Sequence, residues 1–396
     1  MTTATQTVGS SVSNWFRISH ISAGFIAVLV GYTSSVAIIF QAAQAAGATP
    51  AELNSWMWAL GIGMGASCIG LSLRYRSPVL TAWSTPGAAL LVTSLQGLSM
   101  NQAIGVFLFS SLLITLGGIT GWFQKLMQYM PRHIAAAMLA GILIRFGMDL
   151  FLAMQTQWVM VGLMFLTFVL GRIWLPRYTI PLALAVGVIC AGALGLLHLD
   201  ALSWTPARPL LMAPEFSPSA LIGVGIPLFI VTMTSQNVPG LAVLRANGYN
   251  TPASPLIGWT GGIGLLLGPF GGFSFNLAAI TAAICMSKDA DPDPDKRYGA
   301  AVWAGVFYLA TGIFGATVVS LFNAFPGELV AAIAGLALLG TIANSLAGAL
   351  TEERGREAAV VTFICTASGL SFMGIGSAFW GLVFGLAVHL FTKRPA

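Results

Sequence analysis

The sequence predicts an all-α polytopic membrane protein with about 14 transmembrane spans, arranged as two inverted repeats of seven spans. Three observations predict this fold: the scarcity of charge, the positions of the charges that are present, and a pattern shared by the two halves. Charged residues make up 7% of the 396 residues, and AVILMFWYC residues make up 57%. Soluble globular proteins carry roughly 25% charged residues. A chain of this size cannot cover a soluble surface with so few charges, so most of it must face lipid.

Fourteen apolar segments fit along the chain when each span is given about 20 residues. The third and tenth segments are short and open with a proline and small residues, and the eighth contains Pro239 and Gly240. The expected spans are residues 21–45, 55–73, 78–97, 102–124, 131–150, 157–175, 179–198, 218–246, 254–268, 269–286, 299–322, 327–350, 357–373 and 375–392.

The positions of Lys and Arg support this count and give an orientation. If the N-terminus is cytoplasmic, fifteen of the 17 basic residues fall on the cytoplasmic side, Arg208 falls outside, and Arg145 lies within the fifth span. One miscounted span would exchange the sides of every later loop. The positive-inside rule therefore favours fourteen spans with both termini in the cytoplasm.

The two halves of the chain, residues 1–200 and 201–396, share a repeated pattern. TSSVAIIFQAAQAAGATP at 33–50 matches TSQNVPGLAVLRANGYNTP at 234–252, and the third and tenth spans open with proline at corresponding places. Because each half has an odd number of spans, the second half must enter the membrane with opposite polarity. Inverted repeats with discontinuous helices at equivalent places are typical of a secondary transporter whose site lies near the midplane.

The third and tenth spans are predicted to hold that site. Pro78 and Pro269 lack backbone donors and disfavour helix before them. We therefore expect extended backbone over about 78–84 and 269–275. Such backbone at membrane depth is tolerated only inside protein or beside a water-filled cavity.

A half-helix is expected to follow each extended stretch, starting near Thr85–Pro86 in the third span and near Asn276 in the tenth. Free N–H groups and about half a positive charge at each helix N-terminus favour an anion without a buried Lys or Arg. Gly87, in the first turn, tolerates backbone geometries that other residues resist. Thr85 and Asn276 occupy matching positions, where their side chains either contact a ligand or only cap their own helices.

Polar residues on the first and eighth spans complete the candidate site. The eighth helix is expected to be interrupted at Pro239–Gly240, and Gln236 and Asn237 precede this break. Their amides either hydrogen-bond a carboxylate or a coupling water, or satisfy backbone groups that the proline frees. Ser34 and Ser35 are the corresponding residues of the first half.

Two carboxylates are candidates for proton coupling, Asp149 and Glu328. Asp149 lies four residues after Arg145 on the fifth span, so we expect the two to form a structural ion pair or to lie near the outer interface, and proton coupling is the alternative role of Asp149. Glu328 follows Pro326, where an acid suits the first turn of a helix, and this is its alternative role.

Neither a metal, a cofactor nor a nucleic acid is expected. The loop 288–297 (KDADPDPDKR) alternates Asp residues, but Pro294 stands where a calcium loop requires Gly, so we interpret it as a solvated cytoplasmic turn. The net charge of +5 comes without a basic cluster that would bind nucleic acid. No zinc-protease or phosphate-loop motif occurs in the sequence.

The sequence resembles the benzoate/proton symporter (BenE) family. The resemblance is carried by GYTSSVAI (31–38), TAWSTPGAALL (81–91), TSQNVPGLAVLRANGY (234–249) and GPFGGFSFNLAAITAAICM (268–286). It extends over essentially the whole chain, and the last two strings are the most specific. It implies a bacterial inner-membrane importer of benzoate, a small aromatic carboxylate, together with protons.

More distantly, the resemblance implies the seven-plus-seven inverted-repeat fold of nucleobase transporters and of sulfate- or bicarbonate-type anion transporters. In that fold a core domain carries the substrate and a gate domain supports it, and homodimers are common. The core would comprise about residues 17–124 and 218–322 here, and the gate about 131–198 and 327–392.

One departure from that wider fold concerns charge. Its nucleobase members carry acidic residues on spans eight and ten, where this chain has neutral residues such as Gln236 and Asn276. This fits an anionic substrate, which a nearby carboxylate would repel, but it leaves the proton carrier unidentified. The substrate ring would face Phe275. The leading hypothesis is proton-coupled import by alternating access without enzymatic activity; a nucleobase or inorganic-anion carrier, or an anion channel, is the alternative.

Overall fold

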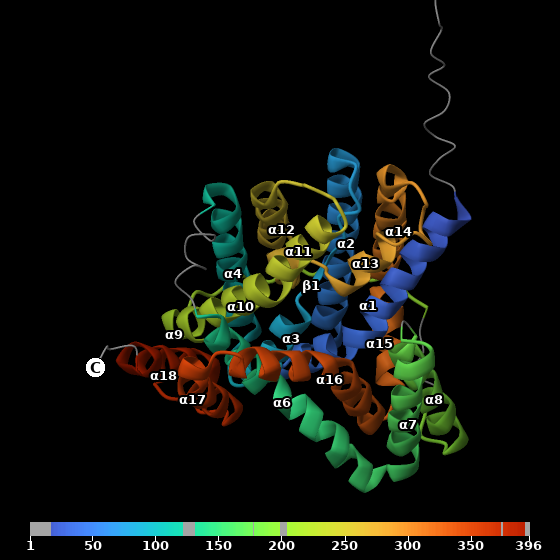
Figure 1. Cartoon of the computed structure of the whole chain (residues 1–396). Helices are drawn as coiled ribbons and strands as arrows, with labels where there is room; N and C mark the ends of the chain where they lie inside the picture. The colour runs from blue at the N-terminus through green and yellow to red at the C-terminus, as the bar shows by residue number, and fades with distance from the viewer. Residues whose placement is uncertain (1–16, 122–130, 177, 199–203, 374, 393–396) are drawn as a thin grey trace, which may run out of the picture.

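The computed structural model describes residues 17–121, 131–176, 178–198, 204–373 and 375–392. These residues form helices, most of them joined by short connections, as Figure 1 shows. Two short strands among them pair into a sheet. Local signals set several helix ends. Thr49 and Glu52 form a capping box at the start of the second helix, and Gly121 ends the fourth main helix in the left-handed conformation.

The first half contains seven helices and one strand in its described part. They are α1 (Ile18–Ala45), α2 (Pro50–Tyr75), β1 (Thr81–Trp83), α3 (Thr85–Ser94), α4 (Met100–Thr120), α6 (Arg132–Thr156), α7 (Trp158–Trp174) and α8 (Thr179–Ala193).

The second half is more broken. Its elements are α9 (Pro218–Ala220), η3 (Leu221–Gly225), α10 (Ile226–Thr232), η4 (Met233–Asn237), α11 (Val238–Ala246), α12 (Ala253–Leu267), η5 (Gly268–Phe270), β2 (Phe275–Leu277), α13 (Ile280–Cys285), η6 (Pro294–Lys296), α14 (Tyr298–Ile313), α15 (Gly315–Asn323), α16 (Gly327–Leu350), η7 (Glu353–Gly355), α17 (Arg356–Ala367) and α18 (Ser377–Thr392).

Six helices in the described chain are long and apolar enough to cross a membrane: α1, α2, α4, α6, α16 and the stretch Pro218–Ala246. The pair Pro294–Ile313 and Gly315–Asn323, bent by 67°, would make a seventh if it is one span. The helices α7, α8 and α18 are apolar but shorter. A multi-pass protein is therefore shown, and the total of fourteen spans stays a prediction.

The expected break at Pro239 is wrong. Residues 218–246 run as one helical stretch, and α11 continues directly from η4. The segments η3 and η4 are π-helical, with wider turns than an α-helix. Such turns loosen the regular hydrogen-bond ladder, so the missing N–H of Pro239 is accommodated by a local widening and not by a break.

Two groups of helices pack mainly among themselves. In one group, α4 packs on α12, α2 on α14, and α1 on α3, α13 and α14; in the other, α6 packs on α16 and α17, α17 on α18, and α7 on α8. Glycines allow the closest crossings, because a Cβ at Gly118 would overlap the backbone of Gly258, and one at Gly61 would overlap that of Gly312. Small residues at such contacts are typical of helices packed in membranes.

Candidate functional site

The two extended segments meet each other between the helices of the first group. β1 and β2 pair antiparallel, and the pairing continues beyond them because Ser84 N–H donates to the Ser274 carbonyl (3.1 Å) and Ala278 N–H to the Leu80 carbonyl (2.9 Å). This pairing satisfies backbone groups that lipid could not satisfy. The Cα partners are Thr81 with Leu277, Ala82 with Asn276, and Trp83 with Phe275. We call this pairing the strand crossing.

The half-helix of the third span begins at Thr85, as predicted. Its N-cap is Ser84, whose hydroxyl accepts the Gly87 N–H at 3.0 Å, so Thr85 occupies the first helical position. A Cβ at Gly87 would lie 2.8 Å from Ser84 Oγ and 2.9 Å from Leu228 Cδ1, so the close contact requires glycine. The signal for Ser84 was present in the sequence, since a serine followed closely by a proline marks a helix start.

The half-helix of the tenth span does not begin at Asn276, and that prediction is wrong. Asn276 lies in β2, and the helix α13 starts at Ile280 and has six residues. The expected extended stretch at 269–275 is also shifted, because Gly268–Phe270 form a 3₁₀ turn and the strand starts at Phe275. Because the backbone groups of β2 hydrogen-bond to β1, these residues cannot also belong to a helix. Of the two half-helices, α3 is the longer, with ten residues, and so has the larger helix dipole.

Asn276 nevertheless carries an unusual polar atom. Its side chain is fully buried, and its Nδ2 donates to the Ser274 carbonyl at 2.9 Å. Asn276 Oδ1 and Ser274 Oγ are buried without a hydrogen-bond partner in the described structure. Buried polar groups are nearly always paired, so two such atoms on residues two positions apart mark the crossing as a place where a further polar partner fits.

α1 contributes Ser35 to the crossing. The indole Nε1 of Trp83 donates to Ser35 Oγ at 2.7 Å, and Ser35 Oγ donates to the Gly31 carbonyl at 2.8 Å. Tyr32 packs edge-to-face against Trp83, with ring centroids 4.8 Å apart. Ser34 is half-buried and donates to the Gly31 carbonyl at 3.0 Å. Ser35 therefore positions Trp83, and Ser34 bonds only to its own helix.

Asn237 anchors β2 to the eighth span. Its Oδ1 accepts the Leu277 N–H at 2.9 Å, its Nδ2 donates to Met233 Sδ at 3.0 Å, and the side chain is fully buried. The amide thus satisfies a strand and not the helix around Pro239. The neighbouring Gln236 is half-buried, and its amide has no hydrogen-bond partner among the described residues, so it is the freer of the two.

The ring of Phe275 fills space between helices. It is buried and packs against α2 and α12, because a Cβ at Gly63 would overlap the ring and one at Gly264 would lie 3.7 Å from it. The structure therefore gives Phe275 a packing role, and its contact with a substrate ring stays a prediction.

The two carboxylates considered for proton coupling lie away from the crossing, on the second group of helices. Asp149 is on α6, and no ion pair joins it to Arg145 in the described structure, so the expected pair is not formed. Glu328 lies in the first turn of α16, as predicted, and accepts a hydrogen bond from Thr156 Oγ1 at 3.2 Å. Their role in coupling stays a prediction.

Buried charge in the described chain is confined to the loop after α13. Among Asp, Glu, Lys and Arg side chains, only Asp291 and Arg297 are buried, which corrects the expectation of a fully solvated turn. Asp291 accepts hydrogen bonds from Arg17 Nη1 (2.7 Å) and pairs with His20 Nε2 (2.9 Å), while Arg297 Nε donates to the Asp291 carbonyl (2.7 Å). The crossing itself holds no buried charged side chain among these residues.

The pKa of the Asp291 carboxyl is set by opposing effects. Burial alone would raise its pKa, but the Asp293 N–H, the His20 ring and the Arg17 guanidinium favour the charged form more strongly and hold the pKa below its usual range. The carboxylate therefore stays ionised at neutral pH and ties α1 to the loop that follows α13.

Comparison with known proteins gives consistent matches over the whole chain. A family model described as benzoate membrane transport protein (BenE) matches residues 14–391. The chain is 52% identical over 363 residues to the inner membrane protein YdcO of Escherichia coli K12, covering 92% of this chain and 93% of that protein. It is 42% identical over 380 residues to a benzoate membrane transport protein of Acinetobacter baylyi, covering 96% of each.

Solved structures show the same fold at low sequence identity. The transmembrane domain of the cyanobacterial bicarbonate transporter BicA matches with a TM-score of 0.56 and 14% identity, over 95% of this chain and 96% of that one. Murine Slc26a9, an anion transporter in the inward-facing state, matches with a TM-score of 0.62 and 11% identity, over 98% of this chain and 69% of that one.

Proposed function

The chain belongs to the benzoate membrane transport protein (BenE) family, and on this premise we propose that it imports benzoate or a similar small aromatic carboxylate together with protons. Its relatives are membrane transporters and not enzymes, so the activity that we propose is transport across a bacterial inner membrane. The observation that carries it is the capped N-terminus of α3 at the strand crossing, which lies in a protein of this family and has no buried cation beside it.

The substrate carboxylate would approach the first turn of α3, where Ser84 and Gly87 lie. The positive end of a helix stabilises a negative charge by about 0.3–1 kcal/mol at the surface and by up to ~2 kcal/mol where the site is partly buried. Ser274 Oγ can donate a hydrogen bond to the same group, and Gln236 has amide hydrogens to offer. Trp83 and Tyr32 supply aromatic surface next to the crossing.

Transport would then follow from movement of the two helix groups against each other. The group that holds the crossing corresponds to the proposed core (17–124 and 218–322), and the group of α6, α7, α8, α16, α17 and α18 corresponds to the proposed gate (131–198 and 327–392). We propose that Asp149 or Glu328 on the gate takes up the coupled proton, and that the protein is a homodimer with both termini in the cytoplasm.

Uptake of radiolabelled benzoate into proteoliposomes with an imposed pH gradient tests the proposal. We expect uptake that is driven by an acidic exterior, collapses with a protonophore, and is reduced by unlabelled benzoate more than by uracil or sulfate. Absence of gradient-driven uptake by folded protein would exclude proton-coupled benzoate transport. Stronger competition by uracil or sulfate would move the assignment to a nucleobase or inorganic-anion carrier, and bilayer currents far above carrier turnover would indicate a channel.

A further inference from the structure

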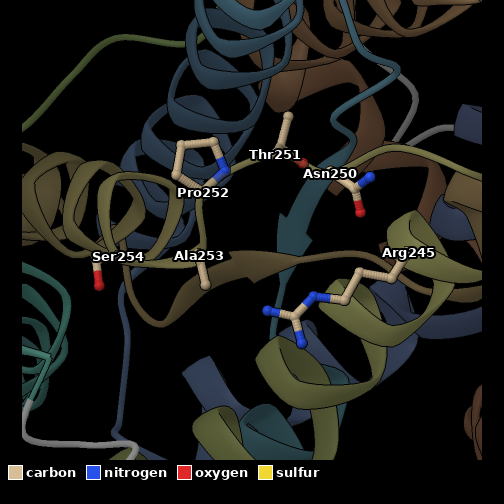
Figure 2. Close-up of a pocket in the computed structure, with 6 residues that line it drawn as sticks. All are labelled: Arg245, Asn250, Thr251, Pro252, Ala253 and Ser254. Carbon is tan, nitrogen blue, oxygen red and sulfur yellow. The ribbon is translucent and has the colours of Figure 1, made fainter.

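Two neighbouring cavities lie at the ends of α4, α11 and α12, outside the strand crossing. The first, about 350 Å³, is lined by Arg245 and the turn 250–254 (Figure 2). The second, about 420 Å³, lies between α4 and α12 and is lined by Gly118, Ile119, Pro255, Gly258, Trp259 and Gly262 together with Ser254. Ser254 lines both cavities, so the polar cavity and the apolar cavity adjoin at the first turn of α12, and we call the two together the depression.

The polar cavity is electropositive. Arg245 lies in the last turn of α11, is exposed, and forms no ion pair or hydrogen bond with the described residues. Figure 2 shows its guanidinium extending towards the turn 250–254. α12, a helix of 15 residues, starts at Ala253 without a side-chain cap. The N–H groups of Ala253 and Ser254 precede the first intrahelical hydrogen bond, so an unpaired guanidinium and a helix N-terminus face the same space, and both suit a phosphate.

The apolar cavity has the character of a surface in contact with lipid. Ile119 is 73% exposed and Trp259 is 61% exposed, although both are large and hydrophobic. A Cβ at Gly262 would meet no atom within 4 Å, so the bottom of the groove is open beside that glycine. In a membrane protein, exposed apolar side chains suit the acyl chain of a lipid, and an arginine near the membrane surface suits an anionic head group.

We propose that this depression binds an anionic phospholipid of the cytoplasmic leaflet. Its phosphate would pair with Arg245 and the N-terminus of α12, and one acyl chain would lie in the groove between α4 and α12. The adjoining apolar groove favours a lipid over free phosphate, which would occupy only the polar cavity. Arg245 lies on the side that the positive-inside rule assigns to the cytoplasm. This proposal does not depend on the identity of the transported substrate.

Native mass spectrometry of the purified full-length protein, exchanged from detergent with defined lipids, tests the site. We expect retained phosphatidylglycerol to exceed phosphatidylcholine. Arg245→Gln should reduce retention by about fivefold, the equivalent of the ~1 kcal/mol that one basic residue contributes near an anionic membrane surface. Lys288→Gln removes the same charge from another exposed site at this end and should leave retention unchanged.

A second pair of variants tests the groove. Gly262→Leu should fill it and reduce phosphatidylglycerol retention, whereas Gly162→Leu, also at a glycine with no neighbouring atom within 4 Å, should not. Equal retention of both lipids, or equal loss in Arg245→Gln and Lys288→Gln, would overturn the proposal. So would displacement of the lipid by glycerol phosphate at matched concentration, because the site would then bind the phosphate alone. Melting curves show whether each variant is folded. If Arg245→Gln or Gly262→Leu is unfolded, the other of these two variants tests the site.

Discussion

Ser84 is the residue through which the proposed carboxylate site is most directly tested. Its hydroxyl holds the Gly87 N–H and so shapes the first turn of α3. Ser84→Ala should lower the free energy of unfolding by about 1 kcal/mol, the usual cost of a lost N-cap, and should also weaken benzoate binding. Binding by isothermal titration calorimetry and melting by intrinsic fluorescence give the two readouts.

Ser99→Ala is the matched control for that variant. Ser99 caps α4 in the same way, accepting the Gln102 N–H at 3.2 Å, but lies at an exposed helix start away from the crossing. It should lose similar stability and keep its affinity for benzoate. If both variants bind as the wild type does, the N-terminus of α3 is not the carboxylate site.

Asn276 and Gln236 provide a second test at the scale of single side chains. Asn276→Ala removes the buried Oδ1 that has no partner, and Gln236→Ala removes a free amide. Each should abolish detectable benzoate binding while leaving expression intact, because neither amide holds another element of the fold in place. Gln96→Ala is the control, because the exposed amide of Gln96 donates only to the Val92 carbonyl nearby in the chain. Wild-type affinity in both test variants would refute this part of the site.

At the scale of elements, the loop after α13 is held by ionic hydrogen bonds that depend on pH. The folded state lowers the pKa of Asp291, so this group stabilises the fold above its unfolded pKa of about 3.9 and loses that effect as the pH falls through the folded value. Asp291→Asn should cost about 2–3 kcal/mol at pH 6, because it weakens hydrogen bonds to a charged group. The difference in melting temperature from wild type should shrink below about pH 4.

Asp293→Asn is the control for this pH dependence. Asp293 pairs with Lys296 at the surface of the same loop, at 2.7 Å, and both side chains are about two-fifths exposed. Salt bridges at the surface contribute little to stability because solvent screens them, so Asp293→Asn should change the melting temperature little at either pH. A gap between wild type and Asp291→Asn that is equal at pH 6 and pH 3.5 would contradict the assigned role.

The elements also show how far sequence reasoning reaches. Hydropathy and charge identify the membrane class, and the Ser-Thr-Pro pattern places the start of α3, because both signals are local. The start of α13 was misplaced because residues 275–277 are held by pairing with residues 81–83, almost two hundred positions away. The prediction of a break at Pro239 is wrong for a different reason. The wider turns of η4, just before the proline, let the helix continue through it, and no residue type in that stretch signals a π turn.

At the scale of the whole molecule, the proposal requires the two helix groups to move relative to each other. Ser94, at the end of α3, and Gly376, before α18, lie on opposite groups, and a Cβ at Gly376 would be 3.8 Å from Ser94 Oγ. Cysteines at these two positions would therefore have neighbouring side chains, which a disulfide between the two groups requires. In a background without the four native cysteines, Ser94→Cys combined with Gly376→Cys should lose benzoate uptake on oxidation and regain it on reduction. Each single variant should transport in both conditions, and undiminished uptake by the cross-linked protein would argue against relative movement here.

The strand crossing has one more consequence for the molecule as a whole. Backbone hydrogen bonds join the third and tenth spans, and Asn237 fastens the eighth to them. These two connections join three spans into one unit, which would keep its geometry if the core moves as proposed. A bound substrate would then keep the same contacts on both sides of the membrane, and only the side from which the site is open would change.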